Sequence, residues 1–458
     1  MLLAGGSAAQ GSPVGAWTYA LAAPFRTVDD GVTLADLQAA WRGRPGGALA
    51  THPLLVSAGT QHVLAALWGE PAARAVRTVD EQRLLAEAER TSAWAIVPFD
   101  ALEMRWKVLL VDGLSPLARG LGQSYPLQVP LSLTGRRAQE VLPLVAANPV
   151  ALTNRQEGRM TTVAMTGVTA LVRAAAKVME AYGVTYPAKD IKDWLLDADL
   201  THISNEVCFD TNYQPQTDPE SLRFSSKDSY IELLEAVSTD IVELTGNHML
   251  DYGPEPFLHT LDLYRQRGWQ WFGAGEDLEA ASRPLKIEHN GNRLAFLGCN
   301  WWGPPSTWAT EDSPGCAPCD FARMQAQVRA LRSEGYLPVV TFQYMETYEY
   351  TPTPQQVVDF RSMAEAGAVV VQGSQAHQPQ AIEFQDEAFI HYGLGNLFFD
   401  QMQTLGTRQE FIDRLVFYDN RLLSVELRTA MLEEWARPRP MTPEERAALL
   451  REIFAIQP

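Results

Sequence analysis

The sequence predicts an α/β protein in which a small α/β domain precedes a larger, layered α/β domain. Short apolar strands alternate with amphipathic helices along most of the 458 residues. A proline-containing stretch interrupts this alternation over residues 121–155. Residues 1–150 hold 12 basic and 12 acidic side chains, whereas residues 151–458 hold 25 and 43 and carry the whole net charge of −18. The change in charge indicates a domain boundary near residue 150.

The first 12 residues are mostly small, and we expect them to form a flexible terminus. They lack the basic region and the apolar stretch of a complete signal peptide. Leu2–Gly5 is similar to the end of a bacterial lipoprotein signal, but Gly6 stands where the lipidated cysteine would follow. We therefore expect any membrane anchor to be missing from this chain.

Residues 13–150 are expected to form the small α/β domain. The expected elements are helix 33–41 with Thr33 as its N-cap, strand 53–57, helices 60–68 and 79–90, strands 93–97 and 108–111, and helix 138–147 in the connection. The segments L-A-D-L-Q-A-A-W-R-G and A-W-A-I-V-P-F-D-A-L resemble a lobe of bacterial solute-binding proteins. The resemblance implies either binding of an oxyanion or small ligand, or a remnant domain without a ligand.

Residues 158–458 are expected to form the larger domain, which ends in a helix capped by Thr442 and Glu445. Its expected strands are 163–167, 200–204, 241–244, 294–297, 338–342, 369–371 and 390–392, and its expected helices are 168–182, 229–237, 257–268, 321–334, 354–367 and 446–454. In such α/β folds the functional site lies at the carboxyl ends of the strands.

The composition excludes several classes of protein. An acidic surface repels nucleic acid phosphates, so binding of DNA or RNA is disfavoured. No stretch approaches the roughly 20 consecutive apolar residues that a membrane span requires.

The four cysteines are Cys208, Cys299, Cys316 and Cys319. A zinc ribbon requires a second C-x-x-C pair, and the C-A-P-C motif lies in a loop rather than at a helix start, so zinc and thioredoxin-type roles are disfavoured. Two alternatives stay open: a disulfide between this loop and Cys299 in an exported protein, or free thiols in a reducing compartment.

Polar side chains gather after four of the expected strands. They are Asn205 and Glu206, then Asn247, His248 and Asp251, then Gln343, Glu346 and Glu349, and finally Gln375 and His377. Carboxylate, amide and imidazole groups from several strand ends suit a divalent cation, and two such ions would hold a phosphate or activate water. The alternative is that each group only caps a helix or a loop. His391 lies inside an apolar strand and is expected in the core or at an edge, whereas Asn396 and Asp400 follow that strand.

Several of these segments resemble the CapA family of poly-γ-glutamate capsule proteins. L-T-G-N-H-M-L-D-Y-G resembles the family's A-N-N-H-x-x-D-x-G, G-S-Q-A-H-Q-P-Q-A-I-E resembles G-H-H-P-H-V-x-Q-P-I-E, and I-H-Y-G-L-G-N-L-F-F-D resembles Y-S-L-G-N-F-V-F-D. S-N-E at 204–206 and T-G-V-T-A-L-V-R at 166–173 also occupy the places of family motifs. The resemblance covers residues 160–400 and implies the four-layered αββα fold of calcineurin-like metallophosphoesterases.

The departures from the family pattern concern metal ligands. Val168 stands where the family has an aspartate, and valine cannot bind a metal. The family's H-W-G-x-E-Y has lost its histidine, and Ser374 and Gln375 replace two histidines. A standard dinuclear centre is therefore in doubt, and we expect either one divalent ion (Mn, Zn or Fe) or none.

The resemblance implies roles for the residues that remain. We expect catalytic roles for His248, Asp251 and His377, metal ligation by Glu206, Asn247, His248 and His377, and substrate binding by Asn205, Gln343, Glu346, Glu349, Gln375, Asn396 and Arg173.

Three functions are compatible with these roles. The first is a capsule or poly-γ-glutamate protein of the bacterial cell envelope that binds or processes an anionic peptide-like polymer. The others are a single-metal hydrolase of phosphoesters or amides, and an inactive cell-surface protein that binds a small-molecule or other ligand. The extracytoplasmic location depends on the resemblance alone.

Overall fold

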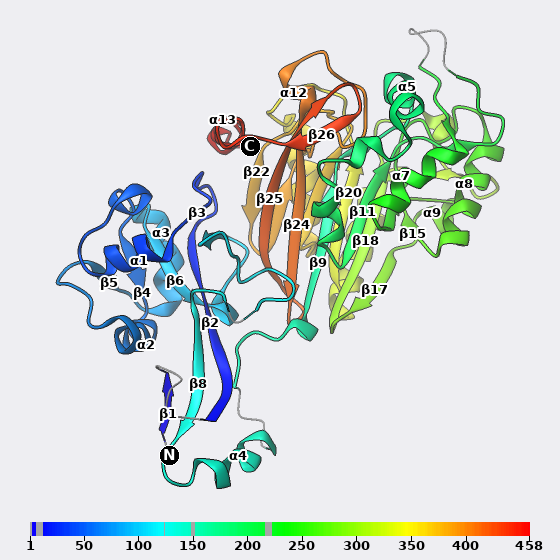
Figure 1. The fold of residues 1–458 in the computed structure, drawn as a ribbon. Helices are drawn as coiled ribbons and strands as arrows, with labels where there is room; N and C mark the ends of the chain where they lie inside the picture. Colours follow the sequence, from blue (N-terminus) through cyan, green and yellow to red (C-terminus); the bar gives the residue numbers. More distant parts are fainter. Residues whose placement is uncertain (1, 6–11, 123, 148–151, 216–221) are drawn as a thin grey trace. The chain divides into compact units, whose positions relative to one another are not determined.

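The computed structural model describes residues 2–5, 12–122, 124–147, 152–215 and 222–458. The chain forms two compact units, Met1–Arg159 and Met160–Pro458 (Figure 1). Each unit has its own sheets and its own apolar core.

A mixed sheet with helices packed against it forms the first unit. In spatial order its strands are β1 (Leu2–Gly5), β8 (Gln128–Thr134), β2 (Ser12–Pro24), β6 (Trp94–Pro98), β4 (Leu54–Val56) and β5 (Val76–Thr78), and β7 (Trp106–Val111) joins β2 to β3 (Gly31–Val32). The helices are α1 (Leu34–Trp41), α2 (Ala58–Trp68), α3 (Leu84–Thr91) and α4 (Ala138–Ala147). Its core includes the buried rings of Trp41 and Trp94. The interpretation of this unit as similar to a solute-binding protein stays a prediction.

The structure tests two expectations for this unit, the N-cap of α1 and the flexible N-terminus. Thr33 caps α1 as expected, because its hydroxyl accepts from the Asp36 amide while the Asp36 carboxylate accepts in return. Leu2–Gly5, expected within a flexible terminus, instead form β1 and pair antiparallel with β8. Ala4 and Gly5 have low strand propensity, so this strand was not expected. Residues 6–11 of that segment lie outside the described residues.

The first sheet of the second unit is parallel in one half and antiparallel in the other. In spatial order it contains β15 (Gln270–Phe272), β14 (Thr239–Glu243), β11 (Leu200–Asn205), β9 (Met160–Thr166), β24 (Gln409–Tyr418), β25 (Leu422–Glu433) and β26 (Arg437–Pro440), and β10 (Val168–Thr169) pairs with β11. The helices associated with it are α5 (Arg173–Tyr182), α6 (Lys192–Leu196), α7 (Ile231–Ala236) and α8 (Pro254–Arg267).

The second sheet of this unit has a parallel centre with an antiparallel strand at each edge. In spatial order it contains β17 (Leu285–His289), β18 (Asn292–Asn300), β20 (Leu337–Gln343), β21 (Val370–Ser374), β23 (Ala388–His391) and β22 (Ile382–Gln385). Helices α10 (Phe321–Ser333) and α11 (Pro354–Ala366) cover it. The remaining short elements are β12 (Phe209–Asp210), β13 (Ser226–Lys227), β16 (Ala274–Gly275), β19 (Gly315–Cys316), α9 (Leu278–Ala281) and α12 (Leu405–Arg408).

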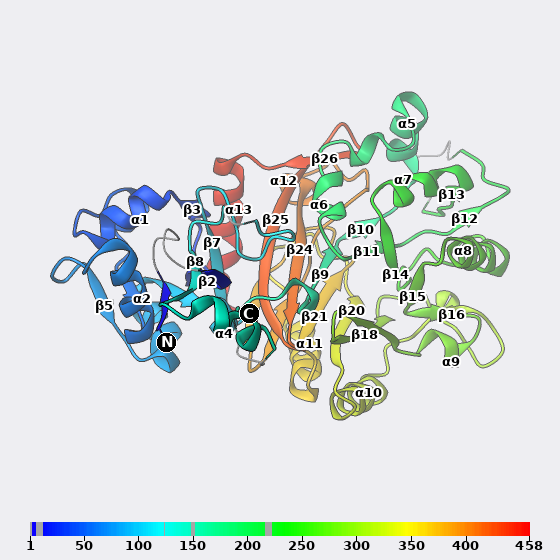
Figure 2. The same cartoon turned by 60° about the horizontal axis from the view of Figure 1, so that its bottom comes forward.

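These sheets and helices form four layers. One apolar cluster joins residues of α5–α8, such as Leu234, to outward residues of the first sheet, such as Ile203 and Val242. Another joins α10 and α11 to the second sheet, for example Phe360 to Val340. In Figure 2, α10 and α11 lie beside β18, β20 and β21, while α5–α7 lie on the opposite side beyond β11. The expected αββα arrangement is therefore confirmed.

The inner faces of the two sheets carry buried polar pairs. His202 Nε2 lies 3.3 Å from Glu243 Oε2, and His391 Nδ1 lies 2.7 Å from Asp413 Oδ2. Gln372 on β21 donates to Asp413 on β24 and so joins the sheets directly. His391 is fully buried, which confirms its expected place in the core.

Two parts of the second unit differ from what the sequence led us to expect. The helix expected from residue 168 begins at Arg173, because Val168 and Thr169 pair with β11. The long hairpin of β24 and β25 was not expected at all. Glu410, Asp413 and Arg414 interrupt its apolar pattern, although all three are buried in the sheet. The terminal helix α13 (Pro443–Ala455) has the expected capping box of Thr442 and Glu445.

The cysteine alternatives are resolved in favour of a disulfide. Cys299 at the end of β18 is bonded to Cys319 in the C-A-P-C loop, and Cys208 and Cys316 are free and buried. The bond closes a loop across 20 positions of sequence. It ties the segment that precedes α10 to the second sheet.

We predict that two of the four cysteines react with a thiol reagent when the protein is unfolded without reductant, and four after reduction. Replacement of Cys299 and Cys319 by serine should lower the free energy of unfolding by about 3 kcal/mol, because the unfolded chain gains loop entropy. Denaturant titration measures this loss. Four reactive thiols without reductant would contradict the pairing.

Candidate functional site

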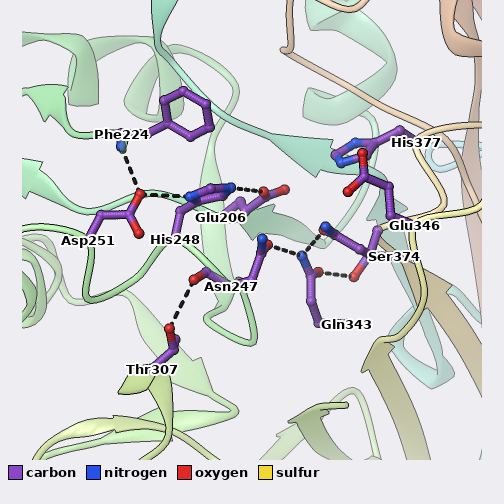
Figure 3. Close-up of polar contacts among 12 residues, drawn as sticks. Glu206, Phe224, Asn247, His248, Asp251, Thr307, Gln343, Glu346, Ser374 and His377 are labelled. Carbon is purple, nitrogen blue, oxygen red and sulfur yellow. Dashed lines mark hydrogen bonds and ion pairs between the residues drawn. The ribbon is translucent and has the colours of Figure 1, made fainter. Parts of the chain in front are cut away.

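The candidate site lies where the central strands of both sheets end. Glu206 follows β11, His248 follows β14, Gln343 ends β20, and His377 follows β21. Figure 3 shows these side chains converging from the two sheets. The parallel strands explain this arrangement, because their carboxyl ends meet at one edge of each sheet.

His248 is held between two carboxylates. Its Nδ1 donates to Asp251 Oδ2 at 2.7 Å, and its Nε2 lies 3.6 Å from Glu206 Oε1. Asp251 is fixed in turn by the backbone amide of Phe224. Gly246 permits this approach, since a Cβ at that position would lie 2.5 Å from the Glu206 Cα. Burial opposes protonation of His248, but the hydrogen bond to Asp251 and the charge of Glu206 outweigh it and raise the pKa of His248 above 6.5.

A network of amide side chains lies beside His248. Gln343 Nε2 donates to Asn247 Oδ1 at 3.0 Å and also to Gln375 Oε1. Ser374 donates to Gln343 Oε1 at 2.6 Å, and Thr307 donates to the backbone carbonyl of Asn247. The amide groups thus satisfy one another across the two sheets (Figure 3).

His377 stands on the other side of the site. Its Nδ1 donates to Asn396 Oδ1 at 2.9 Å, and its ring stacks against Tyr348 at 6.0 Å between centroids. The Tyr348 hydroxyl donates to Glu346. Burial, this hydrogen bond and the nearby charge of Glu206 raise the pKa of Tyr348. Tyr348 therefore remains a neutral hydrogen-bond donor at physiological pH.

Arg173 contributes a permanent positive charge. Its Nε and Nη2 both donate to Asp400, which also accepts from the Ala174 backbone amide. The guanidinium lies between the rings of Phe224 and Phe399, at 5.1 and 4.9 Å from their centroids. Cation–π attraction and the forked ion pair together hold it in one orientation.

The two aromatic rings connect Arg173 to both histidines. The Phe224 centroid lies 4.4 Å from that of His248, and the Phe399 centroid lies 5.3 Å from that of His377. These contacts therefore form a continuous arc of rings around the Arg173 guanidinium. The arc runs from His248 through Phe224, Arg173 and Phe399 to His377. We call it the aromatic arc.

Strained backbone conformations occur at several positions of the site. Arg173, Tyr348, Gln375 and His377 all have positive φ, between 48° and 77°. Such conformations are unfavourable for residues other than glycine and persist where the surrounding structure imposes them. Here they set the directions of side chains that face the site.

The metal centre that the resemblance implies does not fit the residues present. Val168 is fully buried in an apolar cluster with Phe224 and Phe399, where a carboxylate ligand was expected. Within the described part of the chain, no three or more His, Cys, Asp or Glu side chains gather into a group that could hold a metal ion. The expected ligands Glu206, Asn247, His248 and His377 thus do not form such a group. Asn247 Oδ1 instead accepts from Gln343, and His377 Nδ1 donates to Asn396.

Most of the expected site residues lie together, and two do not. Those that the structure gathers are Arg173, Glu206, Asn247, His248, Asp251, Gln343, Glu346, Gln375, His377 and Asn396. The Asn205 side chain instead donates to Val207 O and binds Tyr264 OH on α8, because alternation along β11 points it to the outer layer. The Glu349 side chain is exposed and makes no hydrogen bond to a described residue. Substrate binding by these two residues is not supported.

Sequence reasoning missed the aromatic members of the site. Phe224 lies in a segment without a motif, and Phe399 lies in the I-H-Y-G-L-G-N-L-F-F-D motif but had no expected role; the fold brings both to Arg173. Tyr348 lies inside T-F-Q-Y-M-E-T-Y-E-Y but was not singled out. Asp400 was noted without a role. The matching charges of Arg173 and Asp400, both in family motifs, were the one signal available for that pair.

The fold and the site define a class: a four-layered αββα protein with a polar site where the central strands of both sheets end. The sequence profile of the family "Bacterial capsule synthesis protein PGA_cap" matches residues 162–401. The chain belongs to this capsule synthesis family, as the CapA resemblance predicted.

Curated relatives carry related names. A capsule biosynthesis protein CapA of Bacillus anthracis is 24% identical over 319 residues, which cover 66% of this chain and 77% of that protein. A PGA biosynthesis protein CapA of Bacillus subtilis strain 168 is 27% identical over 201 residues, covering 44% of this chain and 52% of that protein. A probable polyglutamine synthesis accessory protein of Mycobacterium tuberculosis is 29% identical over 40% of this chain and 51% of its own length.

Solved structures similar to this chain include two nucleotidases. A 5'-nucleotidase precursor from Thermus thermophilus is 14% identical, with a TM-score of 0.37 over 65% of this chain and 58% of that one. A putative 5'-nucleotidase from Staphylococcus aureus is 13% identical, with a TM-score of 0.37 over 64% of this chain and 58% of that one.

Within the described ranges, every helix is too short or too polar to cross a bilayer.

We predict that His248 titrates above its ordinary pKa of 6.5 and that Asp251→Asn lowers this pKa, because an acceptor remains but its charge is lost. Since the folded-state pKa is raised, the stability that protonated His248 contributes is complete below pH 6.5 and is lost as pH rises through the folded-state pKa. The imidazole NMR shift of His248, measured against pH, gives this pKa in the wild type and in Asp251→Asn. Asp262→Asn, at an exposed position of α8, is the matched control. A His248 pKa that Asp251→Asn leaves unchanged would contradict this assignment.

Proposed function

We propose that this protein acts at the bacterial cell envelope in the synthesis or handling of an anionic capsule polymer of the poly-γ-glutamate type. In this proposal the polymer binds at the site that contains Arg173 and His248. The family match supports it, because residues 162–401 include every gathered residue of the site. The names of the relatives from Bacillus point to the same class of polymer.

The observation that carries the proposal is the free edge of Arg173. Its Nε and Nη2 are bonded to Asp400, while Nη1 has no partner among the described residues, and the side chain is 26% exposed. A guanidinium edge of this kind binds carboxylates with defined geometry. The polymer presents a carboxylate on every unit, so Arg173 matches its repeating chemical group.

The acidic charge of the chain restricts where such a polymer can bind. A net charge of −18 repels a polyanion at long range. This repulsion is screened beyond about 8 Å at physiological ionic strength, whereas contacts inside a partly buried site are screened much less. We therefore expect one short stretch of polymer to bind at the site.

His248 supplies the chemistry for processing the bound polymer. Its raised pKa and its hydrogen bond to Asp251 fit a residue that donates or accepts a proton near neutral pH. Asp251 would orient the ring, and Nε2 is the atom directed toward Glu206.

We predict that a γ-linked glutamate oligomer binds the wild-type protein and that Arg173→Met weakens this binding at least tenfold. A charge-assisted hydrogen bond contributes about 1.5–3 kcal/mol, and 1.4 kcal/mol corresponds to a factor of ten. Isothermal titration calorimetry measures the change. Arg329→Met, at an exposed position of α10, is the matched control and should bind as the wild type does.

Arg173→Met leaves the buried Asp400 without its partner, so a second variant guards against unfolding. Arg173→Met combined with Asp400→Asn removes both charges together and should fold while binding as weakly as the single variant. Equal binding by the wild type and this double variant would overturn the role of Arg173. A failure of the wild type to bind any γ-linked oligomer would overturn the proposed function.

A further inference from the structure

Glu206 differs from the other carboxylates of the site. Asp251 accepts from His248 and from a backbone amide, Asp400 is paired with Arg173, and Glu346 accepts from Tyr348. Glu206 is 2% exposed, and its Oε2 is buried without a hydrogen-bond partner among the described residues. Its Oε1 lies 3.6 Å from His248 Nε2, which is longer than an ordinary hydrogen bond.

A buried carboxylate oxygen without a partner is unfavourable unless a ligand satisfies it. In Figure 3 this oxygen points away from His248, to the side on which Glu346 and His377 lie. Glu206 is therefore directed into the space between the two histidines of the aromatic arc. The complementary group must be a cation or a hydrogen-bond donor.

The surroundings of Glu206 suit an organic ammonium group better than a metal ion. A metal requires several further ligands, but Val168 is apolar and the nearby amides are bonded to one another. An ammonium group requires an acceptor and gains further stabilisation from aromatic faces. The rings of Phe224 and Tyr348 pack against the two histidines of the arc.

Arg173 and His248 both pack against the ring of Phe224. The Phe224 ring lies 5.1 Å from the Arg173 guanidinium carbon and 4.4 Å from the His248 ring, which in turn approaches Glu206. The site thus offers one acceptor for a cation and one donor edge for a carboxylate, connected through the packed rings of Phe224 and His248.

One part of a γ-linked glutamyl chain carries both matching groups. Its amino-terminal residue has a free α-ammonium and a free α-carboxylate on the same carbon, whereas the α-nitrogen of every later residue is an uncharged amide. We infer that this site recognises the amino-terminal residue of a γ-glutamyl chain, with the α-ammonium on Glu206 and the α-carboxylate on Arg173. This inference rests on the proposed function and adds the end of the chain that is bound.

The test compares two γ-linked triglutamates by calorimetry, in the presence of a chelator. One has a free amino terminus, and the other carries glutarate in place of its first residue, so that only the amino group is missing. The wild type should bind the free-amine oligomer at least tenfold more tightly. Glu206→Gln should abolish this preference and bind both oligomers alike, while Glu387→Gln, whose side chain is 88% exposed in the wild type, should retain it.

The outcomes separate the inference from the function on which it rests. Equal binding of both oligomers by the wild type, or a preference that survives Glu206→Gln, would overturn the ammonium site and leave the proposed function standing. A preference that appears only when Mn²⁺ replaces the chelator would also overturn it. Binding of neither oligomer would overturn the proposed function itself.

Discussion

The forked ion pair between Arg173 and Asp400 is the constraint on which the site depends. It ties the first turn of α5 to the segment after β23, and the rings of Phe224 and Phe399 enclose it. Because these rings also pack against His248 and His377, the position of one guanidinium fixes both ends of the aromatic arc. Loss of this pair would leave Asp400, which is 5% exposed, as an uncompensated buried charge.

The edge at which the central strands of both sheets end therefore carries different side chains from those that the family pattern implies. Val168 pairs through its backbone with the segment at Asn396, and its side chain joins the apolar cluster beside Arg173. Amide side chains from both sheets bond to one another near the place of the lost histidines. The strand ends still converge, but they present a guanidinium, imidazoles and a carboxylate whose Oε2 has no partner among the described residues. Such a set is suited to a charged organic ligand.

The sequence predicted the layered fold and most of the site because strand–helix alternation and post-strand motifs survive in it. His248, Asp251 and Glu206 follow strands of the predicted sheet, so their convergence followed from topology. The Asn205 side chain meets Tyr264 in the outer layer, because alternation along β11 decides which face of the sheet each side chain takes. Substrate binding by Asn205 stays a prediction. The contacts of Phe224 and Phe399 with Arg173 were not predictable, since an aromatic residue in a loop carries no signal of the cation that it contacts. The β24–β25 hairpin was missed because buried charges such as Asp413 have partners only in the folded protein.

We propose that these residues build a site for a charged organic ligand rather than a metal centre. The most direct test is the metal content of the wild-type protein, purified without chelators or metal-affinity columns and measured by plasma mass spectrometry, with Glu206→Gln alongside. We expect far less than one equivalent of Mn, Zn or Fe in both proteins, even after incubation with each metal and removal of the excess. One or more equivalents in the wild type that disappear in Glu206→Gln would contradict it.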